Sequence, residues 1–459
     1  MIDMLKQPKT NPGAGCAVAV APASNEDRVQ AVLAAFARPT AKKFPAWLQT
    51  IRAAAAVDAA KVGFSTIRDE EWKFTNMAPL LQLPLHPAQK SGLAPGLKDI
   101  SGFTFGLDCY RLVFVDGYFC AKLSSLPGKN NDLQLGSLAE YAEANPSEMR
   151  KHLTRHACGG MNFFTALNTA YFQDGAFVSI AAGKTADKPI HLLFIGASEQ
   201  PGSTSLPRNL ILAASGAELK IIESHVSLSD APRVANGVTE LALGPNARVE
   251  HCMVQQESEQ AFHVATVQAV LSKDSRWTSH SISLGARVAR NQIQARFDAE
   301  GGEAILNGLY LGGGDQLVDH HTVVDHAMPH CASHEFYHGV MAGRAHGVFN
   351  GKIFVRKDAQ KTDAKQTNRN LLLSDTAMID TKPQLEIFAD DVKCTHGATV
   401  GQLSDESLFY LQARGIGVEN ARRMLIQAFA SGVIERIGIA PVRAYLEERL
   451  AGRFLPAQK

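Results

Sequence analysis

The sequence predicts a mainly β protein, in which a β-solenoid core is flanked by N-terminal and C-terminal α-helical regions. The first observation is a repeat: a small polar turn precedes an alternating strand, beginning at residues 216, 246, 274 and 302. The second is a further strand pattern in each unit, at residues 238–243, 262–271, 290–297 and 317–324. The third is the helical spacing of apolar residues on either side of this region. A near-constant period with two strands per unit is typical of stacked repeats, although a sandwich or meander of hairpins remains the alternative.

The composition limits the class of protein. The 459 residues are 45% hydrophobic and 20% charged, as in globular proteins that bury a large core. Lys and Arg total 46 against 45 Asp and Glu, so the chain lacks the basic excess of a nucleic-acid-binding protein. Its seven cysteines are scattered without a C-x-x-C pair, which favours reduced thiols in a cytoplasmic protein. Neither a secretory signal pattern nor an apolar run of bilayer length is evident, so we expect no membrane association.

The N-terminal part is predicted to contain two segments. Residues 1–26, rich in Ala, Pro, Gly and Asn without a sustained period, are expected to form a flexible extension. Residues 27–100 are expected to form a helical region, whose second helix begins near Pro45 and ends near Gly63. The first helix is marked by apolar residues at helical spacing, namely Val29, Val32, Leu33 and Phe36.

Residues 101–402 are predicted to form the β core, with an α/β segment at its start. Before the repeats, strand patterns occupy residues 110–115, 177–180 and 190–195. A helical pattern spans residues 138–156.

Residues 403–459 are predicted to form a C-terminal helical domain. Ser404 suits the N-cap of its first helix, in which Leu408 and Leu411 are expected to face inward. A third helix is expected to begin at Pro441. The second helix between them carries the apolar stripe Ala421, Leu425, Ala428 and Phe429.

The candidate functional residues are Cys394 and His396. In a β-strand, residues two apart point to the same face, so a thiolate and an imidazole would lie side by side. Both groups are ligands for iron, but two donors make only half of a metal site, which a partner surface would have to complete. The alternative interpretation of Cys394 is a small buried apolar side chain.

Histidines are concentrated towards the end of the core. Most are expected to form hydrogen bonds across strands or to line a subunit interface. His334 to His338 match the H-E-x-x-H pattern of metallopeptidases, but the flanking residues predict a strand, in which the two rings would lie about 13 Å apart, too far to share one ion. The eight in this region, of sixteen in the chain, are His320, His321, His326, His330, His334, His338, His346 and His396.

A glycine-rich run at residues 312–315, Gly-Gly-Gly-Asp, superficially suggests a phosphate-binding loop. It is not followed by Lys and Ser or Thr, so the lysine and hydroxyl of a P-loop are missing. We therefore expect this chain to bind no nucleotide.

Several blocks of sequence, in order along the chain, resemble one known family. They are residues 351–355, 361–374, 383–387, 390–400, 408–411 and 414–416. Together they resemble the SufB/SufD family of iron–sulfur cluster assembly proteins, with similarity over most of residues 42–450. Within the family the chain is most similar to the SufD branch, because residues 68–76 resemble its N-terminal block. The clustered cysteines near the N-terminus of many SufB chains are absent here.

The resemblance implies a right-handed parallel β-helix and a complex with SufB and two copies of the ATPase SufC. In the family, SufC docks on the C-terminal helices, SufB pairs with SufD through the β-helix, and cluster assembly is attributed to the SufB–SufD interface. His396 matches the SufD histidine of the Cys-x-His block, and Cys394 matches the neighbouring cysteine. The chain is thus expected to be a non-catalytic scaffold that shares iron or a nascent iron–sulfur cluster with SufB.

Two other functions, and a homodimeric assembly, remain as alternatives. The chain could be a self-contained His-rich β-helix metalloenzyme that binds zinc or iron by itself. Alternatively it could be a purely structural subunit in which Cys394 and His396 belong to the core. A homodimer is an alternative to the heterocomplex.

Overall fold

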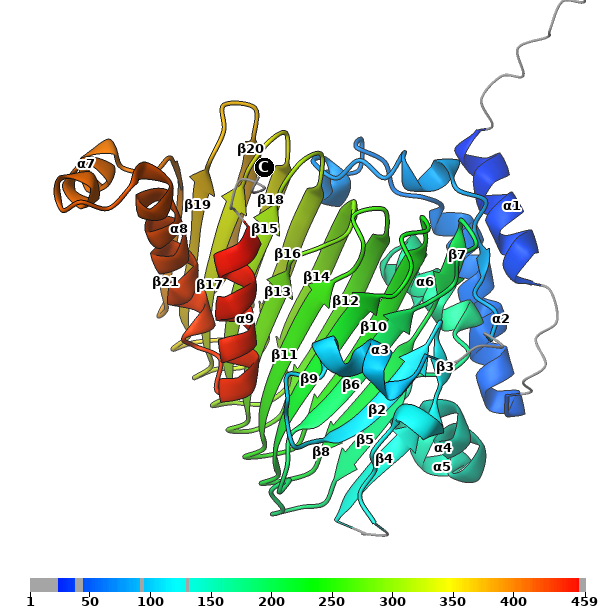
Figure 1. Ribbon diagram of the computed structural model, residues 1–459. Coiled ribbons are helices and arrows are strands. Elements are labelled where there is room, and N and C mark those ends of the chain that lie inside the picture. The colour runs from blue at the N-terminus through cyan, green and yellow to red at the C-terminus, as the bar shows by residue number, and fades with distance from the viewer. Residues whose placement is uncertain (1–23, 38–43, 91–94, 129–131, 158, 454–459) are drawn as a thin grey trace, which may run out of the picture.

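The computed structural model describes residues 24–37, 44–90, 95–128, 132–157 and 159–453. Its centre is a β-solenoid of two facing sheets, so the predicted mainly β fold with flanking helices is confirmed (Figure 1). The predicted extension lies outside the described residues as far as residue 23. Ser24 then caps the first helix, where its side chain accepts a hydrogen bond from the Asp27 amide.

Each coil of the solenoid contributes one strand to each sheet. In spatial order, the first sheet contains β4 (Leu133–Ser137), β5 (Ala176–Ile180), β8 (Arg208–Ala213), β10 (Val234–Leu243), β12 (Phe262–Leu271), β14 (Val288–Phe297), β16 (Leu317–His326), β18 (His346–Val355) and β20 (Met378–Ile387), with β1 (His86–Pro87) and β7 (Ser203–Ser205) beside this path. The second sheet contains β3 (Tyr118–Phe119), β2 (Tyr110–Val115), β6 (Ile190–Gly196), β9 (Glu218–Ser227), β11 (Arg248–Gln256), β13 (Arg276–Ser283), β15 (Glu303–Gly312), β17 (Ala332–Met341), β19 (Asp363–Leu372) and β21 (Lys393–Gly401).

Successive coils pair in parallel and in register. Ile221 of β9 is aligned with His251 of β11, which is aligned with Ser279 of β13. In a sandwich or meander of hairpins, neighbouring strands would instead be consecutive in sequence and antiparallel. Among the strands named above, only β2 with β3 and β4 with β5 pair in this antiparallel way, both at the start of the core. The hairpin alternative is therefore wrong, and the solenoid is confirmed.

A residue with left-handed backbone precedes β9, β11, β13 and β15 of the second sheet, and it explains the repeat in the sequence. Positive φ angles occur at Gly216 (66°), Asn246 (59°), Asp274 (54°) and Gly301 (75°), each two residues before its strand. Gly, Asn and Asp tolerate this conformation best, so a small polar turn recurs in every one of these coils.

Helices α1, α2 and α6 cover the outer face of the first sheet. Aromatic side chains fill this contact, with ring centroids 4.0 Å apart for Phe64 and Phe163 and 5.6 Å apart for Trp72 and Phe164. The helices before the repeats are α1 (Asn25–Phe36), α2 (Ala46–Val62), α3 (Leu97–Ile100), α4 (Leu138–Ala144), α5 (Pro146–His152) and α6 (Phe163–Tyr171). Short 3-10 helices lie at Glu70–Trp72, Leu80–Gln82, Ser101–Phe103, Ala121–Leu123 and Gly159–Met161.

The single helix predicted over residues 138–156 is wrong. Asn145 leaves the helical region, with φ −128° and ψ 57°, and Pro146 starts a separate helix that ends at His152. Proline lacks the N–H that would continue the preceding helix, and its ring disfavours helical backbone at the residue before it.

Three helices follow the core: α7 (Asp405–Ala413), α8 (Val418–Ile434) and α9 (Ala440–Arg453). Helices α8 and α9 pack on the outer face of the second sheet, against Ile222, Val254 and Leu309 among others. Helix α7 projects away from the sheets at the end of the solenoid (Figure 1). None of the helices in the described ranges is long and apolar enough to cross a membrane.

Two predictions about these helices are wrong in detail. Leu408 and Leu411 are only half-buried, and no residue of α7 is buried. In α8, Leu425 and Phe429 are half-buried and Ala428 is exposed. The reason is that α8 contacts the sheet through the neighbouring row of side chains, which includes Ile426 and Ala430. The buried residues of α8 are Ala421, Ile426, Ala430, Val433 and Ile434.

Candidate functional site

The structure places Cys394 and His396 on β21, the last strand of the second sheet. Their aligned neighbours on β19 are Ala364 and Gln366. Both residues share one face of the strand, which is the face that continues the interior of the solenoid. Cys394 is half-buried against the apolar cluster formed with Ile353, Val355, Ala359, Ala364 and Ala389. His396 is exposed, so it is the donor that an approaching molecule reaches.

The two donors differ in readiness to bind a metal. Burial raises the pKa of the Cys394 thiol, so the thiol holds its proton and must release it before sulfur can ligate a metal. Among the described residues, no group of three or more His, Cys, Asp or Glu side chains is arranged to hold a metal ion. The described part of the chain therefore presents Cys394 and His396 as a pair of donors and lacks a closed metal site.

Behind His396, the interior holds a column of polar side chains. Gln366 lies one coil inward and Glu335 one coil further, because Glu335 is aligned with Gln366 and Gln366 with His396. Thr322 Oγ1 donates to Glu335 Oε2 at 2.6 Å, and Gln366 Nε2 donates to Glu335 Oε1 at 3.2 Å. Burial raises the pKa of Glu335 to about 7, although these two hydrogen bonds act in the opposite direction.

Glu335 is also the glutamate of the H-E-x-x-H pattern, and its setting differs from that of a metallopeptidase. The segment is a strand, β17, as predicted. His334 lies on the outer face and is half-exposed, whereas Glu335 points into the interior. His338 is on the outer face too, with its Nδ1 2.8 Å from the carbonyl oxygen of Phe429 in α8. The three side chains do not converge on one point.

Four of the five other histidines near the end of the core have structural partners. Each of four has a ring nitrogen within hydrogen-bond distance of a side chain: His320 with Ser283 (2.9 Å), His321 with Glu71 (2.6 Å), His326 with Ser333 (2.8 Å) and His346 with Asp380 (2.7 Å). These contacts agree with the expectation that most histidines of this region hydrogen-bond between structural elements.

A second polar group lies inside the early coils and was not predicted. Glu223 is fully buried, with Oε1 2.9 Å from His225 Nε2 and Oε2 3.1 Å from His251 Nε2. Thr239 Oγ1 donates to the same carboxylate at 3.0 Å. Burial acts to raise the pKa of Glu223, but the hydrogen bonds from the two imidazoles outweigh it and lower the pKa. The sequence signal was the alternation Glu-x-His in β9, which puts both side chains on the inner face.

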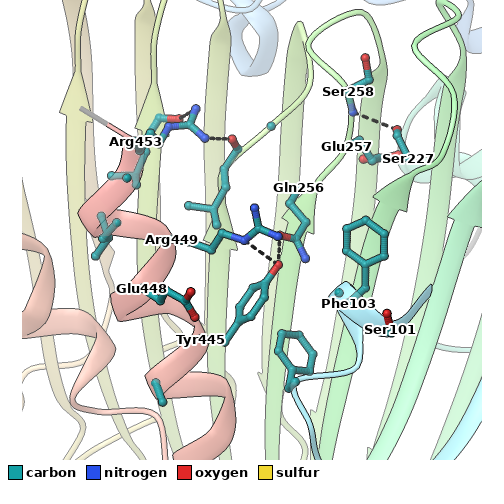
Figure 2. Close-up of a pocket in the computed structure, with 18 of the residues that line it drawn as sticks. Ser101, Phe103, Ser227, Gln256, Glu257, Ser258, Tyr445, Glu448, Arg449 and Arg453 are labelled. Carbon is teal, nitrogen blue, oxygen red and sulfur yellow. Dashed lines mark hydrogen bonds between the residues drawn. The ribbon is translucent and has the colours of Figure 1, made fainter. Parts of the chain in front are cut away.

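A pocket with a volume of about 1160 Å³ lies between α9, the helix Ser101–Phe103 and the outer face of the second sheet (Figure 2). Tyr445 of α9 donates to Gln256 Oε1 at 2.7 Å, and Arg449 Nε donates to the Tyr445 hydroxyl at 3.1 Å. Arg453 Nη2 donates to Gln316 Oε1 at 3.1 Å. These contacts fasten α9 to the sheet, and no lining residue belongs to β21.

Two surfaces at the end of the solenoid expose apolar side chains. On α7, Phe409 is 72% exposed and Tyr410 is 58% exposed. On the last coil, Met378 and Phe388 are exposed, and within the described residues β20 and β21 each pair in their sheet with one neighbour, β18 and β19. Unpaired strand edges and exposed aromatic side chains are features of surfaces that bind other proteins.

Comparison with known proteins gives matches along most of the chain. Residues 194–429 match the family model described as "SUF system FeS cluster assembly, SufBD core domain", and residues 31–192 match "SufBD protein N-terminal region". An iron–sulfur cluster assembly SufBD family protein of Synechocystis sp. is 33% identical over 394 residues, which cover 84% of this chain and 86% of that protein. The iron–sulfur cluster assembly protein SufD of Escherichia coli is 32% identical over 381 residues, covering 82% and 86%.

The β-solenoid and these matches along its length define an iron–sulfur cluster assembly protein of the SUF system. The chain belongs to the SufBD family. The resemblance recognised in the sequence is therefore confirmed, and relatives named SufD agree with the similarity to that branch.

Proposed function

We propose that this chain is a non-catalytic scaffold subunit that pairs with SufB, binds the ATPase SufC, and contributes His396 as a ligand for iron or a nascent iron–sulfur cluster. The observation that carries the proposal is an exposed imidazole beside a half-buried thiol on the last strand of the solenoid. Two donors are too few for a complete site, so the remaining ligands come from the partner. The iron or cluster is cargo of the assembly reaction.

The last coil suits the SufB contact. Within the described part of the chain its two strands each have one unpaired backbone edge, and the edge of a parallel sheet can accept another strand or a second solenoid end to end. His396 lies on this coil, so a partner covering it would bring its own donors next to the imidazole. Cys394 has a smaller part, because its side chain packs against the apolar cluster and its thiol is held protonated.

Helix α7 suits the SufC contact. It buries none of its own residues, yet it carries two exposed aromatic side chains, Phe409 and Tyr410. Helix α8, which follows α7 and contacts it, packs together with α9 on the second sheet. Movement of a docked ATPase would thus be transmitted to the coils near His396.

The proposal is tested in cells that depend on this assembly system, by replacing the chain with His396→Ala. The matched control is His334→Ala, which removes a half-exposed histidine from the outer face of the same sheet. We expect the control to support normal activity of iron–sulfur enzymes and the His396 variant to lose most of it, while both co-purify with SufB and SufC. Full activity with His396→Ala would overturn the ligand role. Failure of the unaltered chain to co-purify with either partner would overturn the scaffold role.

A further inference from the structure

The interior behind His396 contains an unusual amide. Gln366 is buried, and its side chain crosses the interior to the first sheet, where a Cβ on Gly351 would overlap the amide nitrogen. Glycine at 351 therefore leaves the room that this amide occupies. Gln366 Nε2 donates to Glu335, which fixes the direction in which the amide points.

The carbonyl oxygen of the Gln366 amide, in contrast to its nitrogen, makes no hydrogen bond to the described residues. Among the described residues, Gln366 Oε1 is buried and has no hydrogen-bond partner. A buried acceptor without a donor costs about 1–3 kcal/mol, so such an atom usually has a function or a partner that arrives later. On the open side of Gln366, the aligned residue is His396, one strand spacing of about 4.8 Å away.

From this arrangement we infer that Gln366, held by Glu335, is the positioning residue of His396: when the His396 ring turns toward the interior, the unpaired Oε1 accepts the hydrogen of one imidazole nitrogen and leaves the other nitrogen free and facing outward. Histidines that bind metals usually donate their second ring N–H to a carbonyl or carboxylate, which fixes the tautomer and the ring orientation. The ligand role of the free nitrogen rests on the function proposed above, whereas the hydrogen bond does not.

Glu335 completes the arrangement. Its carboxyl group accepts from Thr322 on the opposite sheet and from Gln366, so it is braced from both sides. Without an acceptor at position 335, Gln366 Nε2 would lose its partner and the amide would be free to turn. The buried hydrogen bonds of Glu335 and Gln366 would thus fix the orientation of the His396 ring on the exposed last strand.

The hydrogen bond is tested on the full-length chain by proton–nitrogen correlation spectra with labelled histidine, using His396→Ala to assign the signal. The ring N–H of an exposed, unbonded imidazole exchanges with water too quickly to be seen. We expect an observable N–H signal for His396 in the unaltered chain, its loss in Gln366→Met and Glu335→Met, and its retention in Glu335→Gln, where a side-chain carbonyl remains. A role of Gln366 in packing alone would not move this signal, because methionine keeps the shape of the side chain.

Two results would overturn the inference: no such signal in the unaltered chain, which needs no variant to fold, or a signal that persists in folded Gln366→Met. Iron content of the complex with SufB and SufC separates this inference from the proposed function. A lost N–H signal with unchanged iron content means that the column exists but His396 is not a ligand. The opposite outcome is also informative. If His396→Ala loses iron, but Gln366→Met keeps both the iron and the His396 N–H signal, His396 is a ligand and Gln366 does not position it.

Discussion

Replacing Glu335 with glutamine is expected to stabilise the folded chain at neutral and alkaline pH. Burial raises the pKa of this carboxyl from 4.5 to about 7. Between these values the unfolded chain has already released the proton that the folded chain still holds, so the free energy of unfolding falls as the pH rises. One pKa unit corresponds to about 1.4 kcal/mol, so the full effect is about 3 kcal/mol above pH 7 and vanishes below pH 4.5. Glutamine is always neutral and can still bond to Thr322 and Gln366.

The assay is guanidinium unfolding at about pH 4, 6 and 8, which brackets the two pKa values. Glu335→Gln should match the unaltered chain at the lowest pH and exceed it by up to about 3 kcal/mol at the highest. The control is Glu386→Gln on the outer face of β20, where an ion pair with Lys352 is partly exposed to solvent and worth about 1 kcal/mol or less. A stability difference for Glu335→Gln that does not grow with pH would refute the account of a buried carboxyl.

Three further predictions concern the interior of the solenoid, the buried ion pair between Arg290 of β14 and Asp319 of β16, and helix α7. Trp277→Ala, which empties a fully buried site inside the solenoid, should cost about 3–5 kcal/mol of unfolding free energy in guanidinium titrations. Arg290→Met leaves the buried Asp319 carboxylate without its ion pair and should cost about 3–5 kcal/mol by the same method, most of it recovered when Asp319→Leu is added. Phe409→Glu, at an exposed site on α7, should leave thermal unfolding unchanged but abolish co-purification with SufC; retention of SufC would count against α7 as the docking surface.

The solenoid was predictable from the sequence because its turns obey a simple backbone rule. Gly216, Asn246 and Asp274 are residues that tolerate left-handed backbone, so the repeat is visible. Later coils use His330 and Lys361 at the same place, with φ of 60° and 61°. These side chains carry no turn signal, so the last repeat unit recognised in the sequence is the one that begins at residue 302, although the coils continue to β21.

The site was predictable only in part. Cys394 and His396 could be placed on one face of a strand because alternation is a local property. The column behind His396 could not, since it depends on which residues of successive coils align, and that register links positions about thirty residues apart. The buried face of α8 was predicted wrongly for a similar reason. The helical periodicity was visible in the sequence, but tertiary packing determines which row of side chains contacts the sheet.

The most direct test of the central claim is Mössbauer spectroscopy of the complex with SufB and SufC, assembled anaerobically with either the unaltered chain or His396→Ala. If His396 is a ligand at the subunit interface, the unaltered complex acquires a cluster signal, and the variant complex, equally folded and with the same subunit content, loses it or shows iron with altered ligation. His334→Ala should give the unaltered spectrum. An identical cluster signal in the His396→Ala complex would contradict the account.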